Sequence, residues 1–479
     1  MSAEDPSTDV KPSLSDAGRW LVLGTAFLGW FFAGFLLSTT SLAMRPAAID
    51  LLGRVGSVNQ KDSPELEWFA YYQCAFLFGA AAGGLMFGRL GDRIGRSPAM
   101  AASILCYSLL SAAASFAQTP AQLLVLWFLA CLGVGGMWPN GVALLSETWP
   151  NMSRPLVAGV MGTAANVGIF ALATLGTYEP ITPEHWRWVL LVCAAPAPLG
   201  LFVLLTVPES PRWLAARAEG DATGAPAAPV IPNGSDPFPS SPSPLAGEGW
   251  GGGEQASSPH PPGGREQGNR STQLGISRVF RPPFLGVTLV GILLATIPLI
   301  GGWGSANWMI PWADKAAEQA DPPDAGLKAR VSQARSLTGI VGSLLGGWVG
   351  HVLGRRRSYC LVSLAALFCA QYAFWLLVPT DLSFLFWAAA LGFFSGIFFG
   401  WLPLFLPELF PTAVRSTGAG VSFNFGRILT AVTVFTTGAL AAAFNKDYAA
   451  IGRVTSLVYL LGAVAIWLAP DTTRRQLED

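Results

Sequence analysis

The stretch GRLGDRIGR, residues 88–96, lies between two long apolar runs, and a related stretch, GWVGHVLGR, follows at residues 347–355. A second motif, ETWPNMSR at 147–154, returns as ELFPTAVR at 408–415, and glycine follows each copy at the same spacing, at Gly159 and Gly420. The two motifs recur at offsets of 259 and 261 residues. Because both offsets are nearly equal, they predict a duplicated unit, an arrangement common in transporters with a solute site between two halves.

The composition around these motifs excludes an ordinary soluble protein. The chain is 52% hydrophobic and only 12% charged, whereas soluble domains have about 25% charged residues. A chain of 479 residues with so little charge must face lipid over most of its surface. Its formal net charge of zero gives no indication of a nucleic-acid partner.

The apolar runs predict helices that cross a lipid bilayer. A spanning helix needs about 20 mostly apolar residues, and lipid offers the backbone no hydrogen bonds, which favours helices. Twelve such runs occur, at residues 20–43, 68–88, 98–117, 121–144, 156–176, 187–207, 284–304, 335–353, 358–378, 382–406, 417–443 and 452–469. We therefore predict an all-α membrane protein with twelve transmembrane helices in two pseudo-symmetric six-helix bundles.

The distribution of Lys and Arg predicts the orientation and the domains. Tight basic clusters, such as 89–96 and 355–357, all fall on one side of the predicted membrane, which the positive-inside rule places in the cytoplasm. The predicted parts are a cytoplasmic tail at 1–19, a bundle at 20–214, a disordered Gly/Pro/Ser-rich cytoplasmic linker at 215–277, a bundle at 278–470 and a cytoplasmic tail at 471–479. The linker is either a regulatory loop or a tolerated insertion. The expected location is the inner (plasma) membrane, as a monomer.

Several motifs resemble those of known transporters. GRLGDRIGR resembles the loop motif of the major facilitator superfamily, and PESPRWL at 208–214 looks like the sugar-porter signature. GVGGMWPN at 133–140 and NFGR at 424–427 resemble the aromatic-acid and sialic-acid proton symporter branch. That branch carries two acidic residues in helix 1, where this chain has Ala33 and Leu36. The chain therefore either transports without protons or has a proton site elsewhere, with Glu147 and Glu408 expected as the only carboxylates near the bundle.

The charged residues of these motifs are candidate gating residues. The resemblance implies that Asp92, Arg93 and Arg96 help to hold the outward-facing state. The other charged residues at predicted cytoplasmic helix ends can bridge helices when the inner side is shut, and they are Glu147, Arg154, Glu209, Arg212, Arg355, Glu408 and Arg415. The alternative is a set of topogenic charges or exposed pairs, each worth roughly 0–1 kcal/mol.

A second group of residues is predicted to line a substrate site. Arg427 lies inside a predicted span, where ionisable residues are costly and usually functional, and it either meets a substrate carboxylate or pairs with a glutamate at the cytoplasmic end. Asn140, Asn166, Asn307 and Asn424 either line the cavity or form interhelical hydrogen bonds. Trp30 is a candidate cavity wall, and lipid-facing or interfacial packing is its alternative.

No enzymatic or metal-binding signature is present in the sequence. A Walker A motif is absent, and His185, His260 and His351 are scattered without an HExxH pattern. The expected partners are a small solute, the bilayer and, as a candidate, protons, with no cofactor. We predict secondary active or facilitative transport of a small organic solute, an organic acid or sugar-like metabolite, by alternating access. The alternative is a non-transporting membrane sensor or regulatory protein built on a transporter scaffold.

Overall fold

The computed structural model describes residues 14–56, 64–149, 154–223, 274–411, 414–439 and 447–472, and these residues form helices without a strand. The helices of the first half are α1 (Asp16–Leu42), α2 (Met44–Arg54), α3 (Pro64–Ile94), α4 (Arg96–Ala114), α5 (Pro120–Thr148), α6 (Arg154–Tyr178), α7 (Arg187–Ala194) and α8 (Ala197–Thr206). Helices α9 (Pro211–Thr223) and α10 (Leu274–Val279) lie between the halves in sequence.

The second half begins with a long, interrupted helix. Helix α11 (Leu285–Leu299) continues as the π-helix η1 (Ile300–Ser305) and the 3₁₀-helix η2 (Ala306–Trp308) into α12 (Met309–Glu318). The remaining helices are α13 (Leu327–Val352), α14 (Arg355–Leu376), α15 (Leu382–Glu408), α16 (Arg415–Ala439), α17 (Tyr448–Ser456), α18 (Val458–Ala465) and the short 3₁₀-helix η4 (Ile466–Leu468).

The predicted all-α membrane fold is confirmed. In its described residues, each of the twelve predicted apolar runs falls on a helix or on a helix pair such as α7 and α8. Ten helices among the described residues are long and apolar enough to cross a membrane. Helices α13 and α16, of 26 and 25 residues, are also long but less apolar. Both carry an arginine within their length, at Arg335 and Arg427.

The two halves repeat the same packing pattern. In the first half α3 packs against α5, α1 against α6, and α4 against α8; in the second half α13 packs against α15, α11 against α16, and α14 against α18. The backbones approach closely in two equivalent helix pairs, α3 with α5 and α13 with α15. A Cβ added at Gly83 would lie 1.9 Å from the Leu132 carbonyl oxygen, and one added at Gly400 would lie 2.3 Å from the Ser343 carbonyl oxygen. Small residues allow such close approach between membrane helices. This repetition is the pseudo-symmetry that the duplicated motifs predict.

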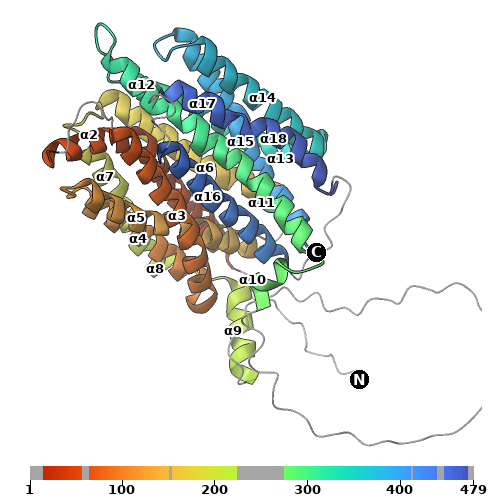
Figure 1. Cartoon of the computed structure of the whole chain (residues 1–479). Coiled ribbons are helices and arrows are strands. Elements are labelled where there is room, and N and C mark those ends of the chain that lie inside the picture. The colour runs from red at the N-terminus through yellow and green to blue at the C-terminus, as the bar shows by residue number, and fades with distance from the viewer. Residues whose placement is uncertain are drawn as a thin grey trace, which may run out of the picture.

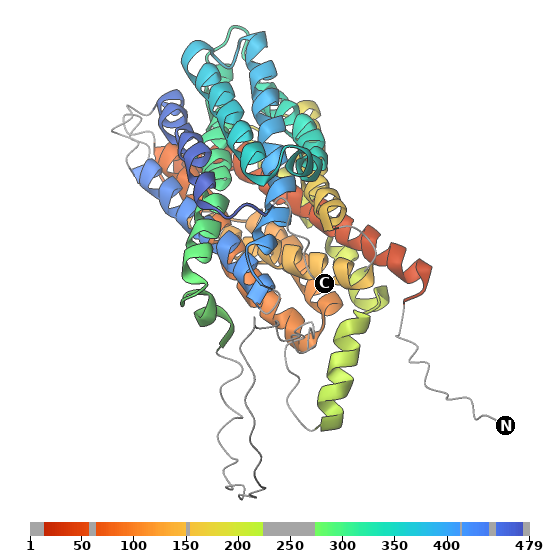
Figure 2. The ribbon, with the colours of Figure 1, turned by 90° about the vertical axis from the view of Figure 1, so that its right-hand side faces the viewer.

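The halves meet along two seams, α6 against α13 and α3 against α16. Helices α2 and α12 lie together at one end of the molecule, and α9 and α10 lie at the other (Figure 1). We refer to these as the α2–α12 end and the α9–α10 end. Figure 2, turned by a quarter, shows α9 projecting from the helical body at the α9–α10 end.

Some predicted boundaries need correction. Helix α13 begins at Leu327 rather than at residue 335, so Lys328 and Arg335 are helical and not in a loop. Lys328 pairs with Asp314, and Arg335 donates to the Ala306 carbonyl; hydropathy alone cannot foresee these contacts between helices. The predicted linker at 215–277 starts within α9 and ends within α10, while residues 224–273 lie outside the described residues. Helix α1 starts at Asp16, inside the predicted 1–19 tail, and the tail residues 1–13 and 473–479 also lie outside the described residues.

Candidate functional site

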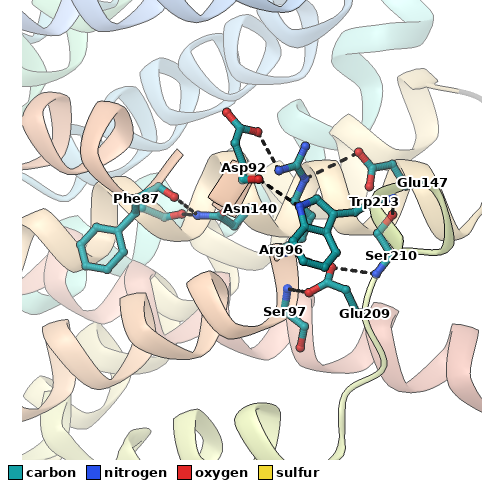
Figure 3. Close-up of polar contacts among 10 residues, drawn as sticks. Phe87, Asp92, Arg96, Ser97, Asn140, Glu147, Glu209, Ser210 and Trp213 are labelled. Atoms are coloured by element: carbon teal, nitrogen blue, oxygen red, sulfur yellow. Dashed lines mark hydrogen bonds and ion pairs between the residues drawn. The ribbon is translucent and has the colours of Figure 1, made fainter. Parts of the chain in front are cut away.

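The loop motif between α3 and α4 is closed by a carboxylate from a distant part of the chain. Gly95 has φ 108°, a conformation that favours glycine. Here the Glu209 Oε1 accepts a hydrogen bond from the Arg96 backbone N–H at 2.9 Å, and Oε2 accepts one from Ser97 N–H at 3.2 Å (Figure 3). Glu209 thereby satisfies N–H groups that a helix start leaves without partners and meets the positive end of the helix dipole.

Burial and hydrogen bonding act in opposite directions on Glu209. Burial raises the pKa of this carboxyl, and the hydrogen bonds from the backbone N–H groups of Ser210, Arg96 and Ser97 lower it, so the pKa is raised overall. The raised pKa favours the neutral, protonated form of Glu209, although the nearby positive charge of Arg96 acts to lower the pKa. The position suits a residue that holds α4 to the segment after α8.

Arg96 joins three sequence motifs in one cluster. Its Nη1 lies 2.7 Å from the Asp92 Oδ1, and its Nε lies 3.8 Å from the Glu147 Oε1. The Trp213 indole N–H donates to the Asp92 carbonyl at 3.0 Å. The side chain of Arg96 is only 10% exposed, whereas that of Asp92 is 50% exposed. The three motifs at 88–96, 147–154 and 208–214 therefore meet at the α9–α10 end (Figure 3).

The second half has an equivalent and tighter cluster. Arg355 follows Gly354, which has φ 81°, and donates to Glu408 through Nε at 3.0 Å and Nη2 at 2.8 Å. The Thr472 hydroxyl donates to the Glu408 Oε2 at 2.6 Å. Both charged side chains are buried, at 9% and 4% exposure. Two-pronged ion pairs of this kind are among the strong hydrogen-bonded contacts in proteins.

The role of Thr472 points to a third repeat that our sequence analysis missed. Pro208-Glu209-Ser210 recurs as Pro470-Asp471-Thr472 at an offset of 262 residues, close to those of the other two motifs. The signal was present in the sequence, as an acidic residue flanked by proline and a hydroxyl residue after the last helix of each half.

The other candidate gating residues are less involved in these clusters. Arg93 and Arg212 are exposed at the α9–α10 end. Arg415 begins α16, and its Nε donates to the Phe410 carbonyl at 3.5 Å. Arg154 begins α6, and its side chain lies outside the described residues.

The opposite end carries buried ion pairs that connect the two halves. Arg45 of α2 is 5% exposed in its side chain, and its Nη1 lies 2.8 Å from the Asp314 Oδ2 and 2.7 Å from the Glu318 Oε1, both on α12. Burial lowers the pKa of Arg45, but the hydrogen bond to Glu318 and the charges of Tyr448, Asp314 and Glu318 outweigh it, so the pKa is raised. Arg45 is thus held firmly in its charged form.

Lys328 of α13, in the second half, extends the same network back to the first half. Its Nζ lies 2.8 Å from the Asp314 Oδ1 and donates to the Ile181 carbonyl of the first half. We call Arg45, Asp314, Glu318 and Lys328 the inter-half charge network. It corrects the expectation that Glu147 and Glu408 are the only carboxylates near the bundle, because Asp314 and Glu318 sit at the contact between the halves.

The interrupted helix α11–α12 faces the first half through aromatic pairs. The Trp303 ring of η1 stacks on Phe76 of α3 with centroids 4.5 Å apart, and Trp308 of η2 meets Phe69 at 5.2 Å. Glycines 301, 302 and 304 make this stretch conformationally permissive. Short π-helical stretches inside α-helices frequently mark functional positions.

Four of the six predicted substrate-site residues lie at a seam or at this interruption. The Asn166 amide of α6 donates to the Ser343 hydroxyl of α13 at 2.9 Å. The Asn307 Oδ1 of η2 faces Arg335 Nη1 at 3.5 Å. Arg427 Nη1 lies 3.4 Å from both the Ala80 carbonyl of α3 and the Asn424 Oδ1.

The other two predicted residues lie within the first half. Trp30 packs on Trp138 with ring centroids 5.0 Å apart. The Asn140 amide donates to the carbonyls of Phe87 and Gly136 at 3.0 and 2.9 Å, which joins α5 to α3 (Figure 3). Its amide is therefore engaged in an interhelical hydrogen bond. Among the residues that the structure describes, no three His, Cys, Asp or Glu side chains gather as a metal site.

Comparisons with known proteins agree with this architecture. The family model "Sugar (and other) transporter" matches residues 25–227. The cis,cis-muconate transport protein of Acinetobacter baylyi is 25% identical over 377 residues, which cover 76% of each chain. The gallate transporter of Pseudomonas putida is 32% identical over 220 residues, covering 44% of this chain and 46% of that one. Escherichia coli XylE, a xylose transporter solved in a partially occluded inward-open conformation, superposes with a TM-score of 0.66 at 14% identity, covering 96% of this chain and all of XylE.

The family model and the relatives are transporters and not enzymes, and two duplicated bundles that meet along a seam are an arrangement common in transporters. The chain shares its overall fold with XylE. The chain therefore resembles the transporters of the major facilitator superfamily, and residues 25–227 match their sugar-transporter family model.

Proposed function

We propose that this protein carries a small organic acid across a bacterial inner membrane by alternating access, as a monomer with both termini in the cytoplasm. One observation carries the proposal. The inter-half charge network joins the halves at the α2–α12 end, whereas the ion pairs Asp92–Arg96, Arg96–Glu147 and Arg355–Glu408 at the other end each stay within one half. The halves are thus fastened together by charge at the α2–α12 end, which we assign to the outer side.

The solute class is supported by the relatives. Their printed substrates include cis,cis-muconate, gallate and 4-hydroxybenzoate, with niacin or nicotinamide for a Bacillus subtilis relative that is 23% identical over 468 residues. Muconate, gallate, 4-hydroxybenzoate and nicotinate are small unsaturated carboxylates. The contact of α3 with the second half offers chemistry that matches such solutes. The cation Arg427 of α16 lies against α3 there, and the aromatic rings of Trp303 and Phe76 stack between η1 and α3.

We further propose that transport does not require protons. Ala33 and Leu36, which replace the acidic pair of the proton symporters it resembles, are fully buried in α1 at 0% exposure. Asp314, a carboxylate of the inter-half charge network, already faces two cations, Arg45 and Lys328. The clusters at the α9–α10 end would then hold each half rigid while the halves rock against one another.

Uptake into proteoliposomes tests this function. The purified protein is expected to give saturable uptake of at least one of cis,cis-muconate, 4-hydroxybenzoate, gallate and nicotinate at neutral pH, and to exchange labelled for unlabelled solute. The rate should be unchanged by an imposed pH gradient. Protein-free liposomes are the control. A complete lack of protein-dependent flux would favour the sensor alternative, and a strong dependence on the pH gradient would contradict proton-independent transport.

A further inference from the structure

We propose that Arg335 binds the carboxylate of the transported solute, at the junction of α13 with the interrupted helix α11–α12. This inference rests on the proposed transport of organic acids and assigns the residue that would select them. Arg335 is the first residue of the predicted span at 335–353, and it therefore escapes a search for charges deep within spans.

The structure holds the Arg335 guanidinium at the helix interruption. Its Nη1 donates to the Ala306 carbonyl at 2.9 Å and lies 3.5 Å from the Asn307 Oδ1. Ala306 and Asn307 form η2, directly after the π-helical turn. The interruption thus fixes one edge of the guanidinium, while its buried Nε has no hydrogen-bond partner in the protein. A guanidinium has five N–H donors in a planar fork that matches a carboxylate.

No carboxylate of the described residues forms an ion pair with Arg335. The buried cations Arg45, Lys328 and Arg355 all have such partners, at 2.7–2.8 Å. Arg335 is half-buried, and withdrawing a cation from water without a counter-ion is unfavourable. A solute carboxylate would supply the missing negative charge, and a neutral solute would not.

A second unpartnered polar group lies on α3, the helix of the first half that faces η1 and η2. The Gln73 side chain of α3 is fully buried, and neither its Nε2 nor its Oε1 has a hydrogen-bond partner in the protein. Residues 69, 73 and 76 share one face of α3 by helical spacing, and Phe69 and Phe76 contact Trp308 and Trp303 of the interruption. Gln73 therefore lies on the face that packs against η1 and η2, where a bound solute could satisfy its amide.

The surrounding helices fit a solute path and not a lipid-facing surface. Helix α13, which carries Arg335, packs against α6 along one seam between the halves. Asn166 of α6 contacts Gly339 and Ser343, one and two turns after Arg335. Helix α13 is also less apolar than the ten helices that could span a membrane by composition, as expected for a helix that lines a polar interior.

A binding experiment with matched ligands tests the assignment. Purified protein in detergent is titrated with nicotinate, 4-hydroxybenzoate and cis,cis-muconate, and each acid is compared with its uncharged carboxamide. Wild type should prefer at least one acid over its amide. Arg335→Gln should weaken binding of that acid roughly 10- to 100-fold, while binding of the amide should change by less than about threefold. Arg335→Lys, which keeps the charge but loses the fork, should be intermediate.

The stability of the ligand-free protein separates a binding role from a structural one. Arg335→Gln removes a half-buried cation that has no carboxylate partner among the described residues, so its Tm should equal or exceed that of wild type. Arg330→Gln is the comparison variant, because Arg330 lies on the same helix but is 44% exposed and pairs with Asp324, so its loss should leave the acid preference and the Tm unchanged. An unchanged acid preference in Arg335→Gln, or a large fall in its Tm, would overturn the assignment while transport of acids stands. Failure of wild type to bind any of the three acids would overturn the proposed solute class as well.

Discussion

Replacing Arg45 with glutamine is expected to open the α2–α12 end and to shift the protein toward the state that faces the opposite side of the membrane. Removing one partner of a buried ion pair typically costs about 3–5 kcal/mol, and about 5.5 kcal/mol moves a two-state equilibrium from 1:99 to 99:1. Arg45 is 5% exposed and contacts two carboxylates of the other half. Its loss leaves Asp314 and Glu318 facing only Lys328 within the network, so the closed state loses most of its inter-half attraction.

The shift can be measured by cysteine labelling at the seam. Gln333 of α13 donates to the Thr174 hydroxyl of α6 at 3.0 Å, near the α2–α12 end. A single cysteine is placed at position 333 after the six native cysteines are replaced. It should react with a membrane-impermeant maleimide at least about tenfold faster when Arg45 is replaced by glutamine than when Arg45 is present. A tenfold change needs only a small part of a full shift between the two states.

Arg54 provides the matched control for this experiment. It lies on the same helix as Arg45 and forms a 2.8 Å ion pair with Asp50, but its side chain is 49% exposed and the pair stays within α2. Arg54→Gln should leave the labelling rate unchanged, because exposed pairs contribute roughly 0–1 kcal/mol. Equal rates in Arg45→Gln and Arg54→Gln would show that the inter-half charge network does not set the conformational balance.

Replacing Glu408 with glutamine is expected to destabilise the second half strongly. Glu408 is 4% exposed in its side chain and receives hydrogen bonds from Arg355 Nε, Arg355 Nη2 and the Thr472 hydroxyl. Losing the carboxylate charge from this buried pair should cost about 3–5 kcal/mol, measured as a fall in Tm of the purified protein.

The first half offers the control for Glu408. Asp92 pairs with Arg96 at 2.7 Å, but its side chain is 50% exposed, so Asp92→Asn should cost only about 0–1 kcal/mol. We therefore expect Glu408→Gln to lower the Tm more than Asp92→Asn does. If Asp92→Asn lowers Tm as much as Glu408→Gln does, burial is not what distinguishes the two clusters.

The sequence was sufficient for the helices and for the duplicated charge clusters. Hydrocarbon imposes a length and an apolar composition on each span, and both are local properties that one segment displays by itself. The clusters around Arg96 and Arg355 were also accessible, because duplication repeats their residues at nearly constant offsets. The predicted span at 335–353 starts later than α13 because the first turns of this helix carry Lys328 and Arg335, which make them less apolar.

The contacts between the halves could not be found in this way. Arg45 and Asp314 are separated by 269 residues, and nothing in either local pattern indicates the other. They meet only because the halves dock, so their roles depend on the relative position of two bundles. Arg335 was missed for a related reason: its lack of a carboxylate partner becomes visible only once its neighbours are placed.

We propose that the two ends of this transporter open in turn. Spin-label distances between the halves test it most directly, with one pair at Tyr178 and Leu382 near the α2–α12 end and another at Ile94 and Val352 near the α9–α10 end, all exposed positions. We expect Arg45→Gln to lengthen the first distance and shorten the second relative to wild type. If both distances move in the same direction, or if only the first changes, the halves do not rock about a central site and the two ends do not open in turn.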